Sequence, residues 1–128
     1  MHKDIRILVV DDFSTMRRII RNRLQELGYH DITEADDGAT ALPLLNAGEF
    51  DLVVTDWNMP RMDGLTLLRK VRASEKLKHI PVLMVTAEAK RDQIIVAAHA
   101  GVNDYILKPF NADELARKIE RIYQRMES

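Results

Sequence analysis

Four apolar residues lead directly into two carboxylates in the segment Ile7-Leu8-Val9-Val10-Asp11-Asp12. The apolar residues follow one another without intervening polar residues, a pattern typical of a strand that is buried on both faces. Strands of this kind occur in parallel sheets that are sandwiched between helices. The segment therefore predicts a central strand of an α/β fold, with two acidic side chains at its carboxyl end.

Other strands are indicated further along the chain. Continuous apolar runs occur at Leu52-Val53-Val54-Thr55, Val82-Leu83-Met84-Val85 and Tyr105-Ile106-Leu107. A weaker strand at residues 31–35 is expected at an edge of the sheet. Helical patterns separate the strands, so the predicted order is βαβαβαβαβα. Alternation of this kind favours a right-handed, doubly wound parallel sheet.

Apolar residues repeat at helical spacing in the segments between the strands. Gly28 follows the first stripe and Gly101 lies near the end of the third, where glycine commonly ends a helix. Pro43 lies inside the second helical segment, 39–47, and is expected to weaken or kink it because proline lacks a backbone donor. The four stripes are Met16, Ile19, Ile20, Leu24 and Leu27; Leu65, Leu68 and Val71; Ile94, Ile95, Ala98 and Val102; and Leu115, Ile119, Ile122 and Met126.

Size, charge and composition exclude several classes of protein. The length of 128 residues suits one domain with one core. Nineteen basic and twenty acidic residues leave a formal charge of −1, which disfavours nucleic acid and anionic membranes as partners. There is no cysteine, so disulfides and thiol chemistry are excluded. The N-terminal residues MHKDIR lack a signal-peptide core, and the longest apolar run, residues 80–87, is too short to span a bilayer.

Polar side chains follow four of the predicted strands. Asp11 and Asp12 follow the first strand, Asp56 follows the third, Thr86 ends the fourth and Lys108 follows the fifth. Ligands of open α/β sheets bind beyond the carboxyl ends of the strands. Three carboxylates, a hydroxyl and an ammonium group are therefore expected to meet at one edge of the sheet.

This combination of groups suits metal-assisted phosphoryl transfer. Clustered carboxylates repel one another unless a cation joins them, and Mg²⁺ prefers carboxylate and phosphate oxygens. A third carboxylate, Asp56, can attack the phosphoryl group and form an aspartyl phosphate. Lys108 and Thr86 can each contact a phosphoryl oxygen. Each residue alone has an ordinary explanation as a cap, a turn or a surface charge, but their convergence favours function.

The whole sequence resembles the receiver domains of two-component response regulators. Its acidic pair, Asp56, Thr86 and Lys108 match receivers in general, whereas residues 12–18 and 56–60 resemble those of bacterial chemotaxis regulators in particular. The resemblance implies a flavodoxin-like α/β fold with five helices and strand order 2-1-3-4-5. The segments that carry it are Val9-Val10-Asp11-Asp12-Phe13-Ser14-Thr15-Met16-Arg17-Arg18, Asp56-Trp57-Asn58-Met59-Pro60, Met84-Val85-Thr86-Ala87-Glu88-Ala89-Lys90 and Lys108-Pro109-Phe110.

The resemblance also implies a role for individual residues. Asp56 is expected to be phosphorylated, with Thr86 and Lys108 contacting the phosphoryl group. The Mg²⁺ ligands are expected to be Asp11, Asp12, Asp56 and the backbone carbonyl of Asn58. The Lys108–Pro109 bond is expected to be cis. The expected switch and partner surface consists of Tyr105, Ala89, Leu107, Phe110, Lys118 and Arg121.

One departure from the family pattern lies beside the switch tyrosine. Asn103-Asp104 stands where close relatives usually have small residues, which adds a carboxylate next to Tyr105.

The implied function is that of a chemotaxis response regulator. Such a protein accepts a phosphoryl group from a chemotaxis sensor histidine kinase and then binds the flagellar motor switch, which controls rotation and swimming. An auxiliary phosphatase is a further candidate partner. The chain is expected to be a single receiver domain over residues 1–128 with no output domain, a cytoplasmic monomer, and a phosphoacceptor that turns over no separate substrate.

Three other functions are compatible with parts of the pattern. A stand-alone phosphorelay receiver would act on a non-flagellar target. A metal-dependent phosphohydrolase would need a further acid–base carboxylate and a substrate-covering cap, for which the chain has no large insertion. A flavodoxin-like electron carrier would need a neutral loop after the first strand, where Asp11-Asp12-Phe13 would repel a flavin phosphate.

Overall fold

A five-stranded sheet with strand order β2-β1-β3-β4-β5 forms the centre of the computed structural model, which describes residues 3–127. All neighbouring strands are parallel. The predicted fold, strand order and edge position of residues 31–35 are therefore confirmed. The elements are β1 Arg6–Val10, α1 Ser14–Glu26, β2 Asp31–Ala35, α2 Gly38–Ala47, β3 Leu52–Asp56, α3 Gly64–Ala73, β4 Val82–Thr86, α4 Arg91–Ala100, β5 Asp104–Leu107 and α5 Ala112–Glu127.

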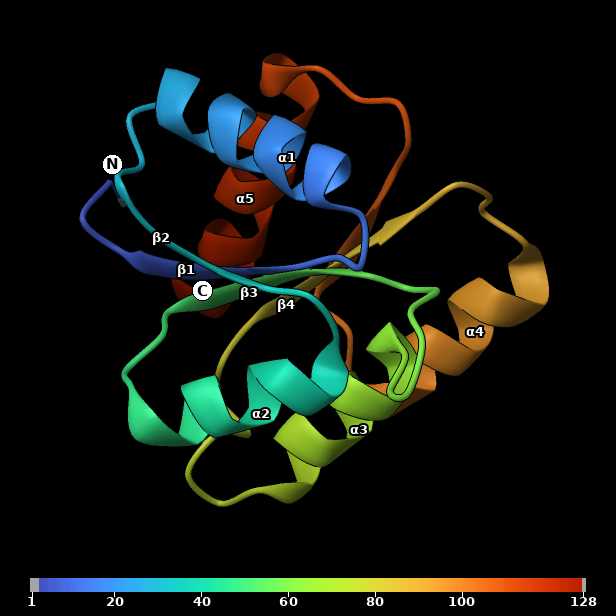
Figure 1. Cartoon of the computed structure of the whole chain (residues 1–128). Helices are drawn as coiled ribbons and strands as arrows, with labels where there is room; N and C mark the ends of the chain where they lie inside the picture. The colour runs from blue at the N-terminus through green and yellow to red at the C-terminus, as the bar shows by residue number, and fades with distance from the viewer. Residues whose placement is uncertain (1–2, 128) are drawn as a thin grey trace.

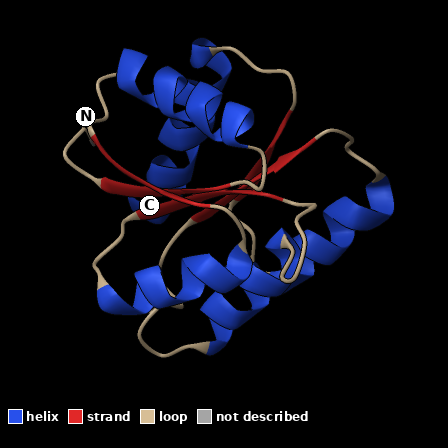
Figure 2. Cartoon of the chain, viewed as in Figure 1, coloured by secondary structure: helices blue, strands red, loops and turns tan. Residues whose placement is uncertain are grey.

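Helices cover both faces of the sheet (Figures 1 and 2). Helices α1 and α5 lie on one face, and α2, α3 and α4 lie on the other. Ile7 and Val9 of β1 belong to the hydrophobic cluster under α1 and α5, whereas Leu8 and Val10 belong to the cluster under α2 and α3. Because both faces are buried, every position of the central strands favours an apolar residue.

Glycines end two helices as predicted, and aspartates cap the start of two others. Gly28 and Gly101 both have a left-handed φ, of 96° and 95°; Gly101 directly follows α4, and Gly28 follows Leu27, the C-cap of α1. Asp37 and Asp63 cap α2 and α3, because their side chains accept hydrogen bonds from backbone N–H groups of the first turn. Pro43 lies in the interior of α2, which nevertheless spans Gly38–Ala47.

Two of the predicted apolar stripes are partly wrong. Ile95 and Ala98 of α4 are exposed, and the residue that α4 buries is Ala97. Met126, at the end of the last stripe, is also exposed. Helix α4 lies at the β5 side of the sheet, where it packs on α3 and leaves much of its surface uncovered (Figure 1). Among residues 3–127, no helix is long and apolar enough to cross a membrane.

Candidate functional site

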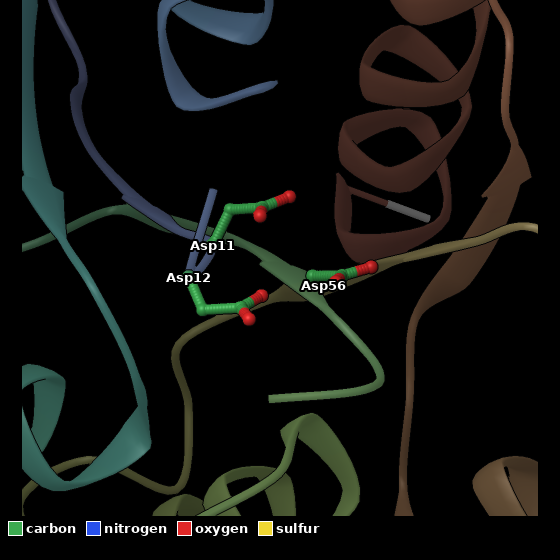
Figure 3. A group of neighbouring side chains, drawn as sticks. All are labelled: Asp11, Asp12 and Asp56. Carbon is green, nitrogen blue, oxygen red and sulfur yellow. The ribbon is translucent and has the colours of Figure 1, made fainter. Parts of the chain in front are cut away.

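Three carboxylates meet at the carboxyl edge of the central strands (Figure 3). Asp11 and Asp12 directly follow β1, and Asp56 is the last residue of β3, the neighbouring strand. Each contributes an oxygen to a group in which all three atoms lie within 4.8 Å of one another. The predicted convergence of the acidic residues is therefore confirmed.

The backbone of Asp11 is fixed on both sides. Its N–H donates to the Ala35 carbonyl at 3.1 Å, and its carbonyl accepts from the Arg17 guanidinium at 2.7 Å. Its Oδ1 accepts a hydrogen bond from the Phe13 N–H at 2.9 Å. Glu34 in turn pairs with Arg17 at 3.2 Å, so β2 and α1 together hold the turn that presents the acidic pair.

The free oxygens of the acidic pair suit a hard cation. Asp11 Oδ2 and Asp12 Oδ1 are buried and accept no hydrogen bond from any residue in the described part of the chain. Burial is the main cause that raises the pKa of Asp11, and the nearby charges of Asp56 and Asp12 raise it further. A bound divalent cation would satisfy both oxygens and offset the repulsion, so the residues present fit Mg²⁺.

Lys108 reaches the site from the end of β5, the edge strand on the side of the sheet opposite β2. It directly follows β5, and its Nζ lies 2.9 Å from Asp56 Oδ1 and 3.9 Å from Asp11 Oδ2. Its backbone N–H donates to the Thr86 carbonyl at 2.8 Å, and the Lys108–Pro109 bond is cis, as predicted. The ammonium group is thus placed beside the carboxylate that is expected to accept the phosphoryl group.

Thr86 lies at the end of β4 with its side chain turned to the following loop. Its hydroxyl donates to the Glu88 carbonyl at 2.9 Å and accepts from the Glu88 N–H at 3.3 Å. A cavity of about 130 Å³ lies between Asn58 and this loop, and Thr86 is among its lining residues. The hydroxyl is therefore next to open space at the site, but it is held by the loop and does not contact the carboxylates.

Two features that position Asp56 were missed from the sequence. Gly64, the first residue of α3, donates its N–H to the Trp57 carbonyl at 2.8 Å, and a Cβ at this position would lie 2.3 Å from the Asp56 carbonyl oxygen. Arg61 has a left-handed φ of 64°, and its Nε donates to the buried carboxylate of Asp37 at 2.5 Å. The second contact anchors the loop after β3 to the start of α2, and nothing in the spacing of these two residues indicated it.

The predicted switch and partner residues lie on the loop before α4, on β5, after β5 and on α5. Tyr105 is half-buried, and its ring centroid lies 5.1 Å from Lys118 Nζ. Ala89, Leu107 and Arg121 are exposed. Phe110 is only partly exposed, because its ring packs against the core under α1 and α5.

Sequence comparisons identify proteins similar to this chain. Residues 7–120 match the family described as the response regulator receiver domain. Chemotaxis protein CheY of Pseudomonas aeruginosa is 66% identical over 122 residues, which cover 95% of this chain and 98% of the relative. Chemotaxis protein CheY-3 of Vibrio cholerae is 61% identical over 126 residues, 98% of this chain and 97% of the relative.

Solved structures share the same fold. Chemotaxis response regulator CheY4 of Vibrio cholerae superposes with a TM-score of 0.86 at 31% identity, over 93% of this chain and 98% of that one. The receiver domain of a sensor histidine kinase from Pseudomonas aeruginosa superposes with a TM-score of 0.83 at 32% identity, over 92% and 96% of the two chains. The latter was solved with a magnesium ion coordinated in its active-site cleft.

Proposed function

The chain belongs to the response regulator receiver family, with 61–66% identity to chemotaxis members of it, and we propose that Asp56 is its phosphoacceptor. The family is one of signalling phosphoacceptors rather than enzymes. The observation that carries the assignment is the meeting of three carboxylates beside Lys108, whose Nζ lies 2.9 Å from Asp56. Asp56 lies nearer to the ammonium group than Asp11 does, since Asp11 Oδ2 is 3.9 Å from Lys108 Nζ.

Each group around Asp56 would have a separate role in phosphoryl transfer. Asp11, Asp12, Asp56 and the backbone carbonyl of Asn58 would hold Mg²⁺, which when bound neutralises charge on the incoming phosphoryl group. Lys108 would exchange its contact with the Asp56 carboxylate for one with a phosphoryl oxygen. Thr86 would donate a hydrogen bond to another oxygen once its hydroxyl leaves the Glu88 carbonyl.

Mg²⁺ binding is expected to depend on the acidic pair and to be visible through Trp57. Because Trp57 adjoins Asp56, Mg²⁺ should change its fluorescence in a saturable manner. Asp12→Ala removes one carboxylate of the cluster and is expected to weaken the apparent affinity by about tenfold or more. Glu75→Ala is the matched control, since it removes the same charge from an exposed side chain of the α3–β4 loop. Equal titration curves for Asp12→Ala and the wild type would contradict the assignment of the metal ligands.

The proposed output is phosphorylation-dependent binding of the flagellar motor switch after phosphoryl transfer from a chemotaxis sensor kinase in the cytoplasm. The relevant surface would comprise Ala89, Tyr105, Leu107, Phe110, Lys118 and Arg121. Thr86 supports this coupling, because its hydroxyl holds the loop that leads to α4. Drawing the hydroxyl toward a phosphoryl oxygen would release that loop. Tyr105 lies on the neighbouring strand β5, where it pairs with Met84, two residues before Thr86.

Thr86 is expected to transmit phosphorylation to this surface. With a beryllofluoride mimic on Asp56, the wild type should bind an N-terminal peptide of the motor switch protein about 5–150-fold more tightly, the usual range for linked sites. Thr86→Ala should lose most of this gain, whereas Thr86→Ser keeps the hydroxyl and should retain it. Fluorescence anisotropy of the labelled peptide provides the affinities. A full gain in Thr86→Ala would contradict this route. Phosphorylation without any peptide binding would instead favour a phosphorelay receiver with another target.

A further inference from the structure

A buried carboxylate holds a lysine of the proposed partner surface. Asp104, the first residue of β5, has a side chain only 10% exposed, and its Oδ1 lies 3.3 Å from Lys118 Nζ. The same oxygen accepts the Tyr105 N–H at 2.8 Å. Lys118 Nζ also lies 5.1 Å from the centroid of the Tyr105 ring, within the range of a cation–π contact. The Lys118 ammonium group therefore contacts both the Asp104 carboxylate and the Tyr105 ring.

We propose that Asp104 is a specificity-determining residue, which withholds the Lys118 ammonium from acidic partners by keeping it over the Tyr105 ring. This inference rests on the proposed function, because it concerns the surface that the phosphorylated protein would present. The ligand class it concerns is an acidic peptide, since the group withheld is a cation. Arg121, one turn further along α5, is exposed and remains available to the same peptide.

Because Asp104 is buried, moving Lys118 away from it is unfavourable. Its Oδ2 is buried and has no hydrogen-bond partner among the described residues, so Lys118 supplies the compensating charge for a carboxylate that water barely reaches. Removing one partner of such a pair leaves an uncompensated buried charge, which is unfavourable. A peptide carboxylate that draws Lys118 outward must therefore work against this cost. A neutral side chain at position 104 would abolish the cost and release the lysine.

The rotamer of Tyr105 is subject to the same contact. While Asp104 holds Lys118, the ammonium group lies against the aromatic ring and adds an attraction that favours the observed ring position. Moving the lysine removes that attraction. Binding of an acidic peptide to Lys118 and reorientation of Tyr105 are thus coupled through one ion pair.

The test is Asp104→Asn, which keeps the shape of the side chain and an acceptor for the Tyr105 N–H but removes the charge. With the beryllofluoride mimic bound, Asp104→Asn is expected to bind the motor-switch peptide roughly fivefold more tightly than the wild type. This is the upper end of the range for ion pairs that water reaches, and the Lys118 side chain is 26% exposed. A copy of the peptide with its carboxylates replaced by amides should show no gain. The double variant Asp104→Asn/Lys118→Met should also lose the gain, because the released cation is absent.

Two further measurements separate this effect from others. Asp113→Asn removes the same charge from an exposed position of α5 and is expected to change peptide affinity by less than about twofold. Labelling with an amine-acylating reagent, resolved by peptide mass spectrometry, should modify Lys118 several-fold faster in Asp104→Asn than in the wild type, with no partner present.

The outcomes distinguish the inference from the proposed function. If the wild type binds the peptide but Asp104→Asn gives no gain, or if Lys118 labelling is unchanged, the inference is wrong and the proposed function stands. If the wild type with the mimic does not bind the peptide at all, the inference and the proposed binding of the motor switch are both contradicted, whereas the assignment of Asp56 as phosphoacceptor is not. The inference is supported if Asp104→Asn binds the peptide more tightly and Lys118 is labelled faster, and if the gain in affinity is lost in Asp104→Asn/Lys118→Met.

Discussion

Asp56→Asn is expected to accept no phosphoryl group from acetyl phosphate in the presence of Mg²⁺, whereas the wild type should gain one. The substitution retains the size of the side chain but removes the carboxylate oxygen that attacks phosphorus. It also removes one of the three carboxylates whose oxygens lie within 4.8 Å of one another. Intact-mass spectrometry of the two proteins after the same incubation measures the difference directly.

Two controls make this experiment specific. Asp113→Asn changes an exposed aspartate that lies outside the acidic cluster, and it should be labelled as fully as the wild type. Chelation of Mg²⁺ should abolish labelling of the wild type and of Asp113→Asn, because Asp11, Asp12 and Asp56 are proposed to act with the metal. Undiminished labelling of Asp56→Asn would show that another residue accepts the phosphoryl group.

Gly64→Ala is expected to lower the free energy of unfolding by about 3 kcal/mol, the upper end of the usual range for overpacking, because two of the atoms it meets are backbone atoms. The added Cβ would lie 2.3 Å from the Asp56 carbonyl oxygen and 3.1 Å from Trp57 Cα, both of which are backbone atoms. It would also lie 2.9 Å from Met84 Sδ. Relief of these contacts requires α3 to move away from the end of β3. Urea unfolding followed by circular dichroism measures the loss.

Gly48→Ala is the matched control for this substitution. There the added Cβ would lie 3.1 Å from the Phe50 ring and 3.4 Å from the Leu44 carbonyl oxygen, so small shifts suffice. We expect a change within about 1 kcal/mol. Because Gly64 packs against Asp56, Gly64→Ala should also weaken the Mg²⁺ response of Trp57, whereas Gly48→Ala should not. Equal unfolding energies of the two variants would contradict the proposed role of the close approach.

The strands and the acidic cluster follow from local sequence. The runs Ile7–Val10 and Leu52–Val54 are apolar at every position because both faces of the central strands are buried. Since parallel strands share a direction, the residues that follow them must emerge at the same edge. Asp11, Asp12, Asp56 and Lys108 could therefore be placed together before the structure was known.

Contacts between distant segments were decided only by the tertiary structure. The glycine required at Gly64 depends on how closely α3 approaches the end of β3, and the anchoring of Arg61 by Asp37 depends on the path of two separate loops. The pairing of Lys118 with Asp104 likewise depends on how α5 packs against β5. Such distances are set by packing of the whole chain, and no periodicity in the sequence records them.

The buried face of α4 was decided in the same way. Its sequence is rich in small and apolar residues on several sides, so hydrophobic spacing alone could not distinguish Ala97, which is buried, from Ile95 and Ala98, which are exposed. A helix over the centre of a sheet buries a broad stripe, but one beside an edge strand contacts less of its surroundings. The position of α4 next to β5, which is a property of the assembled sheet, therefore determined which of its residues reach solvent.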